Sequence, residues 1–251
     1  LGRGSFDSTF RYHVAELSYA NVWLRNLRFN IGVRYELYDY DKFLYQEENT
    51  VWENVKAEHF FTYFAHVHYD TYDKAYFPKR GVNFRAGYTW YTDNFTQYDD
   101  HTPFSAVAGA FEGVVPVSNR FSILPSVYGR FLIGKNIPYS KCNTMGGDIL
   151  EQYLPYQLPF AGTMNVQLMN HSLIIGGLKF RQRMGSIHYL TLSGSYALTS
   201  RKLSGLLNEQ NMFGCAITYG VDSMFGPLEA TLNYTNHSDK VGFYINLGYK
   251  F

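Results

Sequence analysis

The sequence predicts an all-β protein, an antiparallel transmembrane β-barrel of which about eleven strands are visible. Segments of about ten residues alternate apolar and polar side chains, and a tilted strand of that length crosses a bilayer. The connections between them alternate between short and long, as in outer-membrane barrels. The 251 residues are 18% aromatic, with 23 Tyr and 20 Phe, yet the mean hydropathy is only -0.25, which suits a sheet with one apolar and one polar face.

Six alternating segments precede the longest connection of the chain. The clearest is Arg28–Tyr38, where Phe29, Ile31 and Val33 share one face while polar residues occupy the other. Ser8–Ala20 alternates less regularly, and Gly, Pro or charged residues separate the segments. The six predicted strands are Ser8–Ala20, Arg28–Tyr38, Ala57–Tyr69, Val82–Trp90, Phe104–Pro116 and Phe121–Gly134.

Five further alternating segments follow that connection. In the last of them, Phe243, Ile245 and Leu247 alternate with Tyr244 and Asn246. We expect the apolar face of these strands to meet lipid, at Leu190, Leu192, Phe243, Ile245 and Leu247. The five predicted strands are Ser172–Met184, His188–Leu198, Met212–Val221, Pro227–Thr235 and Val241–Phe251.

The connections fall into two sets that alternate along the chain. The mostly short ones are Asn21–Leu27, Asp70–Arg80, Val117–Arg120, Gly185–Ile187 and Asp222–Gly226. The longer ones are Asp39–Lys56, Thr92–Pro103, Lys135–His171 and Thr199–Asn211. In outer-membrane barrels the short turns are periplasmic, so Phe251 is expected at the periplasmic end.

Alternation alone does not say which face lies inside. A soluble β-sandwich or a lipocalin-like barrel would turn the apolar faces inward and the charged faces to water. The aromatic content, the strand length and the final aromatic residue favour the membrane barrel. No run reaches the ~18 apolar residues of a membrane helix, and the net charge of +1 gives no reason to expect nucleic acid.

The longest connection, Lys135–His171, is too apolar for a loop left in water, so we expect it to fold back into the lumen. Its acidic residues Asp148 and Glu151 precede a strand that carries Lys179, Arg181 and Arg183 on one face. A row of basic side chains is a suitable seat for carboxylates, which predicts loop docking between these five residues. The alternative is that the charged residues only make a polar barrel interior.

The sequence contains none of the catalytic motifs that we sought. A Gly-x-Ser-x-Gly nucleophile elbow is missing around Ser193, and there is no Gly-rich phosphate loop. His66 and His68 could bind a metal from one strand face, but such residues are more often polar lining of the lumen. Two cysteines, Cys142 and Cys215, do not make a disulfide framework. We therefore expect no enzyme activity, metal or cofactor in this chain.

Two segments near the C-terminus resemble the surface-antigen barrel superfamily, which includes the barrel-assembly insertase and the two-partner-secretion transporters. Tyr219–Asn236 resembles that superfamily's turn near the C-terminus, on the residues Tyr219, Ser223, Gly226 and Pro227. Val241–Phe251 resembles its C-terminal assembly signal. The resemblance implies that the barrel-assembly machinery recognises Phe243, Leu247, Tyr249 and Phe251.

Three other segments resemble, more narrowly, the barrels of patatin-like phospholipases of Bacteroidota. They are Tyr76–Gly81 (YFPKRG), Tyr153–Gly162 (YLPYQLPFAG) and Leu178–Leu192 (LKFRQRMGSIHYLTL). This resemblance implies a Gram-negative outer membrane, lipid contact, and a barrel that anchors or exports an attached patatin-like domain. An upstream periplasmic or enzymatic domain would be its partner. The alternatives are an assembly or translocation barrel with upstream periplasmic repeats, and a porin-like channel.

The chain departs from the superfamily pattern in two respects. The resemblance implies about sixteen strands, and an odd, all-antiparallel set cannot close because its edges would pair in parallel. Residues 1–251 are therefore expected to be a C-terminal fragment of the barrel domain, and a signal peptide, absent at Leu1, is expected upstream. The superfamily's inward loop carries an Arg-Gly pair, whereas Glu151-Gln152-Tyr153 stands here. The loop is therefore predicted to lack a charged anchor.

Overall fold

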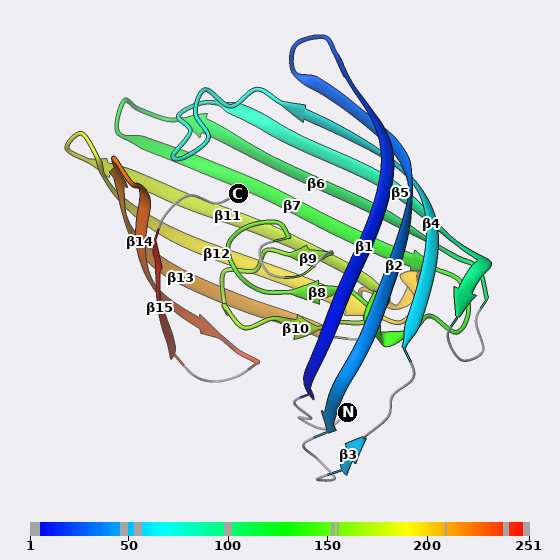
Figure 1. Ribbon diagram of the computed structural model, residues 1–251. Helices are drawn as coiled ribbons and strands as arrows, with labels where there is room; N and C mark the ends of the chain where they lie inside the picture. Colours follow the sequence, from blue (N-terminus) through cyan, green and yellow to red (C-terminus); the bar gives the residue numbers. More distant parts are fainter. Residues whose placement is uncertain are drawn as a thin grey trace.

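Eleven long strands follow one another in chain order in a single curled antiparallel sheet (Figure 1). The computed structural model describes residues 6–45, 50–52, 57–97, 102–151, 154, 156–208, 210–237 and 241–247. The long strands are β1 (Phe6–Trp23), β2 (Leu27–Tyr45), β4 (Glu58–Asp70), β5 (Gly81–Gln97), β6 (Phe104–Pro116), β7 (Phe121–Ile133), β11 (Ser172–Met184), β12 (His188–Ser200), β13 (Gln210–Ser223), β14 (Gly226–Thr235) and β15 (Val241–Leu247).

This arrangement confirms the predicted all-β class and the count of eleven long strands. Among the described residues, β1 and β15 are the two edges of the sheet. A short strand, β3 (Thr50–Trp52), adds to β2. No helix in the described ranges is long and apolar enough to cross a membrane.

The first hairpin is longer than the sequence pattern indicates. β1 pairs with β2 from Phe6↔Tyr45 to Trp23↔Leu27, with a register shift between Thr9 and Phe10. Its turn is tight, with Leu24 and Arg25 both at positive φ (58° and 41°). The prediction ended both strands too early. Backbone hydrogen bonds continue the pairing through residues whose sequence no longer alternates between apolar and polar.

The outward face of the sheet is apolar, as the alternation predicts. Leu192 is 55% exposed and Ile245 is 60% exposed, and aromatic residues such as Tyr88 and Trp90 lie on the same surface. Across the sheet, the inner face instead buries polar side chains, including Glu36, Arg130 and Ser193. An exposed apolar band around a polar interior is the arrangement of a barrel in lipid.

An arginine on this outward face is expected to destabilise the barrel. Ile245→Arg should cost about 2–4 kcal/mol, because a cation at a mid-strand position must leave the bilayer core. Asn246→Arg is the matched control, since Asn246 lies on the inner face opposite Glu229 of β14. Unfolding in phospholipid vesicles measures both. Equal costs would show that the two faces do not differ in lipid contact.

One connection on the short-turn side crosses the end of the lumen. The segment from Asp70 to Gly81 joins β4 to β5, yet its Phe77 ring stacks on Tyr189 of β12 with centroids 4.2 Å apart and planes at 2°. Lys74 Nζ of the same connector lies 3.9 Å from Asp222 Oδ2 near the end of β13. Asp73 fixes the return of the connector, because its Oδ1 accepts the backbone N–H groups of Lys79 (2.8 Å) and Arg80 (3.3 Å).

Candidate functional site

The segment between β7 and β11 is a small folded unit on the inner side of the sheet (Figure 1). It contains a 3₁₀ turn, η1 (Tyr139–Lys141), and three two-residue strands, β8 (Thr144–Met145), β9 (Gln157–Leu158) and β10 (Gln167–Leu168). These strands form their own sheet in the order β10-β8-β9. We call residues 135–171 the inner loop. The sequence pattern missed its strands, because two residues are too few to show alternation.

Apolar side chains of the inner loop pack against the inner wall of the barrel. Met145, Leu158 and Phe160 are buried in one cluster with Leu173 and Ile175 of β11. Burying one large apolar side chain is worth about 1.5–3 kcal/mol relative to exposure. The same cluster includes residues of β6, β7, β12 and β13, namely Ala110, Tyr128, Ala197 and Met212.

The backbone of the inner loop also touches the backbone of the wall. A Cβ added at Gly162 would lie 2.6 Å from the Cα of Gly214 in β13, and one added at Gly214 would lie 2.4 Å from the Cα of Gly162. Any larger side chain at either position would force the two segments apart. Ala161 continues the contact, since its N–H donates to the Oγ of Ser195 in β12 at 3.2 Å.

Lys141 is the charged centre of the inner loop. Its side chain is 0% exposed, and its ammonium donates to the Oε2 of Glu36 in β2, which is also 0% exposed. The ammonium lies over the rings of Phe60 (4.3 Å) and Tyr38 (4.4 Å), with Tyr91 at 5.4 Å. Aromatic faces stabilise a desolvated cation, so this cage offsets part of the water that Lys141 loses.

Glu36 receives several donors in addition to Lys141. The hydroxyl of Tyr12 in β1 donates to Oε1 at 2.8 Å, and the hydroxyl of Tyr156 in the loop donates to Oε1 at 3.1 Å. Arg34 Nη1 lies 4.0 Å from the same oxygen. A buried carboxylate is tolerated when it is paired and hydrogen-bonded in this way.

Arg130 of β7 holds the start of the loop from the other wall. Its Nη1 donates to the carbonyl of Lys141 (3.0 Å) and to the Oδ1 of Asn143 (2.8 Å). Its guanidinium lies 4.1 Å from the ring centroid of Tyr156. Asn143 in turn donates to the carbonyls of Arg130 (3.1 Å) and Asn170 (2.9 Å), which ties both ends of the loop together.

Burial lowers the pKa of the Lys141 ammonium to about 8, while the carboxylate of Glu36 acts in the opposite direction. Desolvation disfavours the charged amine, and the opposite charge favours it. The expectation that the loop lacks a charged anchor is therefore wrong. A charged anchor is present at Lys141, seven residues before Asp148, where the ammonium pairs with Glu36. Gln152 and Tyr153 lie outside the described residues.

The structure brings together two of the five residues that the sequence proposes for docking. Lys179 Nζ lies 3.8 Å from Asp148 Oδ1, in a half-exposed pair of a kind that contributes little. Arg181 instead donates to the carbonyl of Pro78, and Arg183 donates to the carbonyl of Asn119 at 3.1 Å. Glu151 is exposed, with φ 56°. The docking role of these residues stays a prediction.

The C-terminal turn motif forms a tight hairpin between β13 and β14. Ser223 Oγ donates to the carbonyl of Gly226 at 2.5 Å, Gly226 has φ 99°, and Pro227 follows it in a buried position. Tyr219 lies on the outward face beside His188, with its hydroxyl 2.7 Å from Nδ1.

The assembly-signal residues on β15 point outward. Phe243 is 63% exposed and Leu247 is 70% exposed. Tyr249 and Phe251 lie outside the described residues. The assembly role of all four stays a prediction.

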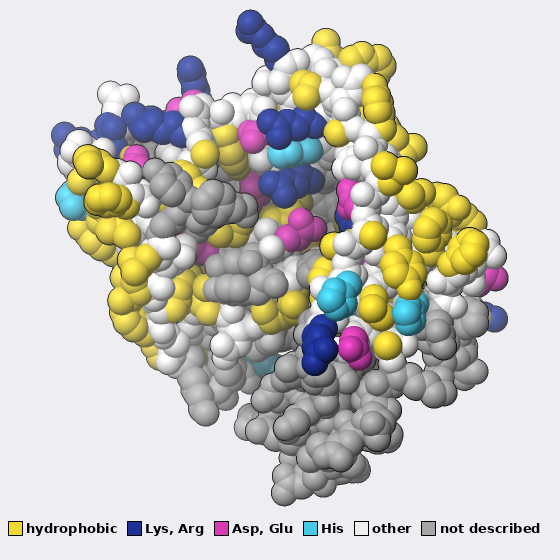
Figure 2. Space-filling view, viewed as in Figure 1, with side chains coloured by type: hydrophobic (Ala, Val, Ile, Leu, Met, Phe, Trp, Pro, Cys, Tyr) yellow, Lys and Arg dark blue, Asp and Glu magenta, His cyan; other side chains and the backbone are white. Residues whose placement is uncertain are grey.

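A cavity of about 820 Å³ lies between the inner loop and strands β1, β2, β4, β5, β6 and β7. Figure 2 shows basic and histidine side chains gathered in this hollow. Its lining includes Arg28, Arg34, Arg85, Arg130, His66 and His68, with Glu16 and Glu151 as the acidic residues. Within the described ranges, no three His, Cys, Asp or Glu side chains are grouped to bind a metal, and Cys142 and Cys215 are free thiols.

Gly146→Ala is expected to loosen the inner loop. Gly146 has φ 140°, and an added Cβ would lie 2.4 Å from the carbonyl oxygen of Asn165, so the variant should cost about 1–3 kcal/mol. Gly176→Ala in β11 is the control, because nothing lies within 4 Å of its added Cβ. Hydrogen exchange at residue 146, whose N–H donates to the Leu158 carbonyl at 3.0 Å, gives the measurement. Unchanged protection at this amide would contradict the expectation.

Comparison with known proteins gives a family and a fold. A family model described as the OMP85 superfamily matches residues 9–251. Among solved structures, the crystal structure of BamA from Haemophilus ducreyi lacking POTRA domains 1-3 matches with a TM-score of 0.70 at 12% identity. The match covers 97% of this chain and 55% of that one, so the chain spans about half the length of its structural relative. No curated protein matches the sequence.

Proposed function

Because the chain belongs to the OMP85 superfamily, we propose that it is an outer-membrane barrel that assembles or translocates polypeptide and keeps its lumen closed with the inner loop. The observation that carries this proposal is the buried Lys141–Glu36 pair, which joins the loop to β2. A simple porin needs an open lumen, whereas this loop is folded, packed and ion-paired inside the sheet.

The similarity to BamA supports an assembly role through the fold alone, at 12% identity. In the proposed orientation, the short turns and the C-terminus lie in the periplasm. There the barrel-assembly machinery would recognise Val241–Phe251. In this proposal the apolar outer face meets lipid, and the inner loop closes the polar lumen.

The alternative proposal is that the barrel anchors or exports an attached patatin-like domain. Two of the three segments that resemble patatin-linked barrels meet in the structure: Phe77 stacks on Tyr189, and Arg181 donates to the carbonyl of Pro78. This contact lies at the short-turn end of the lumen, where an upstream domain in the periplasm would adjoin the barrel.

One experiment distinguishes the two proposals. The parent protein is depleted from the cells that normally carry it in their outer membrane, and its expression is then restored. Loss of other outer-membrane barrels on depletion supports assembly. Loss only of surface exposure of the attached domain, measured by protease shaving, supports anchoring or export. If neither changes and the purified barrel conducts ions freely, the porin-like channel replaces both.

A further inference from the structure

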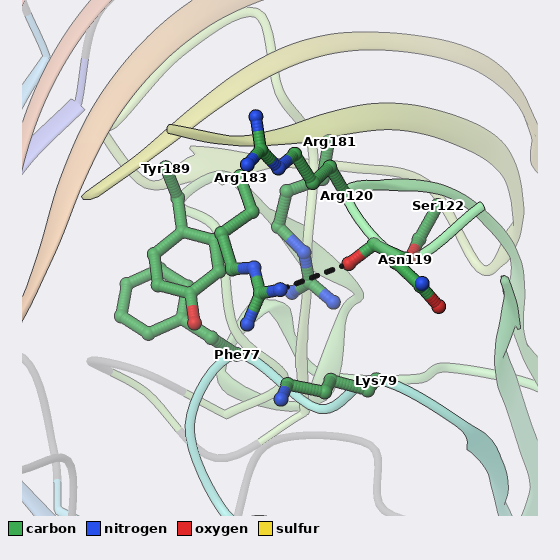
Figure 3. Close-up of a pocket in the computed structure, with 8 residues that line it drawn as sticks. All are labelled: Phe77, Lys79, Asn119, Arg120, Ser122, Arg181, Arg183 and Tyr189. Atoms are coloured by element: carbon green, nitrogen blue, oxygen red, sulfur yellow. Dashed lines mark hydrogen bonds between the residues drawn. The ribbon is translucent and has the colours of Figure 1, made fainter. Parts of the chain in front are cut away.

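A second site lies at the short-turn end of the lumen, apart from the contacts of the inner loop. It is a small pocket of about 20 Å³ that draws its lining from three separate parts of the chain. The β4–β5 connector supplies Phe77 and Lys79, and the β6–β7 turn with the start of β7 supplies Asn119, Arg120 and Ser122. Strands β11 and β12 complete it with Arg181, Arg183 and Tyr189 (Figure 3).

The charge of this pocket is strongly one-sided. Four cations line it, namely Lys79, Arg120, Arg181 and Arg183, and no Asp or Glu is among the lining residues. The carboxylate of Asp73 in the same connector accepts the backbone N–H groups of Lys79 and Arg80. Asp73 and Glu229 also attract the positive charge of Arg181, but neither lines the pocket. Like charges gathered in one place repel each other, so a ligand that supplies negative charge would stabilise the group.

Arg183 contributes a hydrogen-bond donor that the described residues leave without an acceptor. Its Nη2 donates to the carbonyl of Asn119 at 3.1 Å, as Figure 3 shows, whereas its buried Nε has no hydrogen-bond partner in the described part of the chain. A buried N–H without an acceptor costs free energy. The site therefore already holds one guanidinium donor that a ligand oxygen could satisfy.

Two aromatic rings and a second arginine make the pocket rigid. Phe77 and Tyr189 are buried and stacked, and Arg181, 8% exposed, is held by the carbonyl of Pro78. The rim residues Lys79 and Arg120 are exposed. Such a site offers preorganised donors at its base and unfixed charge at its mouth, which is the arrangement that favours a compact oxyanion.

We propose that this pocket binds a phosphate group. The volume accepts about one oxygen-sized group, so one oxygen would enter while the others meet Lys79 and Arg120 at the rim. Four positive charges match a phosphate dianion better than a single carboxylate, and guanidinium groups bind phosphate oxygens in pairs. Free phosphate and a phospholipid headgroup present the same chemistry.

The test is a calorimetric titration. The purified chain in detergent is titrated with inorganic phosphate at fixed ionic strength. Arg183→Gln should weaken binding about tenfold or more, because it removes a charge-assisted donor. Lys202→Gln is the matched control, since Lys202 is an exposed cation between β12 and β13 on the long-loop side, and it should bind like the parent.

If Arg183→Gln does not fold, the double variant Lys79→Gln/Arg120→Gln answers the question, because both side chains are exposed. The proposal would be overturned if that variant bound phosphate with unchanged affinity. It would also be overturned if the parent chain bound chloride as tightly as phosphate. A second titration uses dihexanoyl phosphatidylglycerol. Competition with inorganic phosphate identifies a lipid headgroup as a fitting source, and phosphate binding without competition identifies the free anion. Neither outcome depends on the proposed assembly or export activity.

Discussion

Lys141→Met is expected to destabilise the docked inner loop by about 3–5 kcal/mol. The methionine fills most of the space of the lysine, but the buried carboxylate of Glu36 then loses its directly bonded cation and keeps only Arg34, whose Nη1 is 4.0 Å away. Tyr12 and Tyr156 still donate to Glu36, and two neutral donors do not replace a charge. The free energy of loop undocking, measured by hydrogen exchange at residues 143–146, should fall by that amount.

The double variant Lys141→Met/Glu36→Gln is the control for this prediction. It removes both charges and keeps a polar group for the two tyrosine hydroxyls, so it should recover most of the lost stability. If the double variant is as unstable as Lys141→Met, the loss comes from packing within the aromatic cage. The ion pair would then not be the anchor.

Deletion of residues 143–160 from the parent protein is expected to produce the second large effect, an ion conductance that the undeleted parent lacks. The deleted segment holds Met145, Leu158 and Phe160, which fill the inner side of the wall against Leu173 and Ile175. Without them the lumen contains polar side chains and water, and such a lumen conducts ions. Single-channel recording in planar bilayers measures the change.

A milder variant separates plugging from misfolding. Gly162→Leu keeps the whole loop but forces it away from Gly214 in β13, where a Cβ already meets the backbone at 2.6 Å. It should give brief openings rather than a constant current. If the deletion leaves the conductance unchanged while the barrel stays folded, the inner loop does not close the lumen.

Much of the fold was predictable, because a strand with one apolar and one polar face alternates apolar and polar residues in its sequence. The alternation of β15 shows in the residues from Phe243 to Leu247, and the structure exposes the apolar ones. The ends of β1 and β2 were not predictable in the same way. Backbone pairing from Phe6↔Tyr45 onward carries those strands through residues with no clean pattern.

The site was predictable only in part, because contacts between residues far apart in the sequence cannot be inferred from the local pattern. Asp148 and Lys179 lie near one another in sequence, and the structure places them 3.8 Å apart. Lys141 and Glu36 are 105 residues apart, and their contact depends on the register and curvature of the strands between them. The sequence did offer one signal, a lysine at position 141 in a Gly-punctuated loop that is rich in apolar residues.

Two segments reach across the lumen and link opposite parts of the sheet, and we call them struts. They are the β4–β5 connector and the inner loop. One joins β4 and β5 to β12 through Phe77 and Tyr189, at the short-turn end. The other leaves β7, returns to β11 and grips Glu36 on β2. Since each strut links the early strands to the later ones, widening the lumen must strain both together. The stiffness of this barrel is therefore set across its diameter as well as around its circumference.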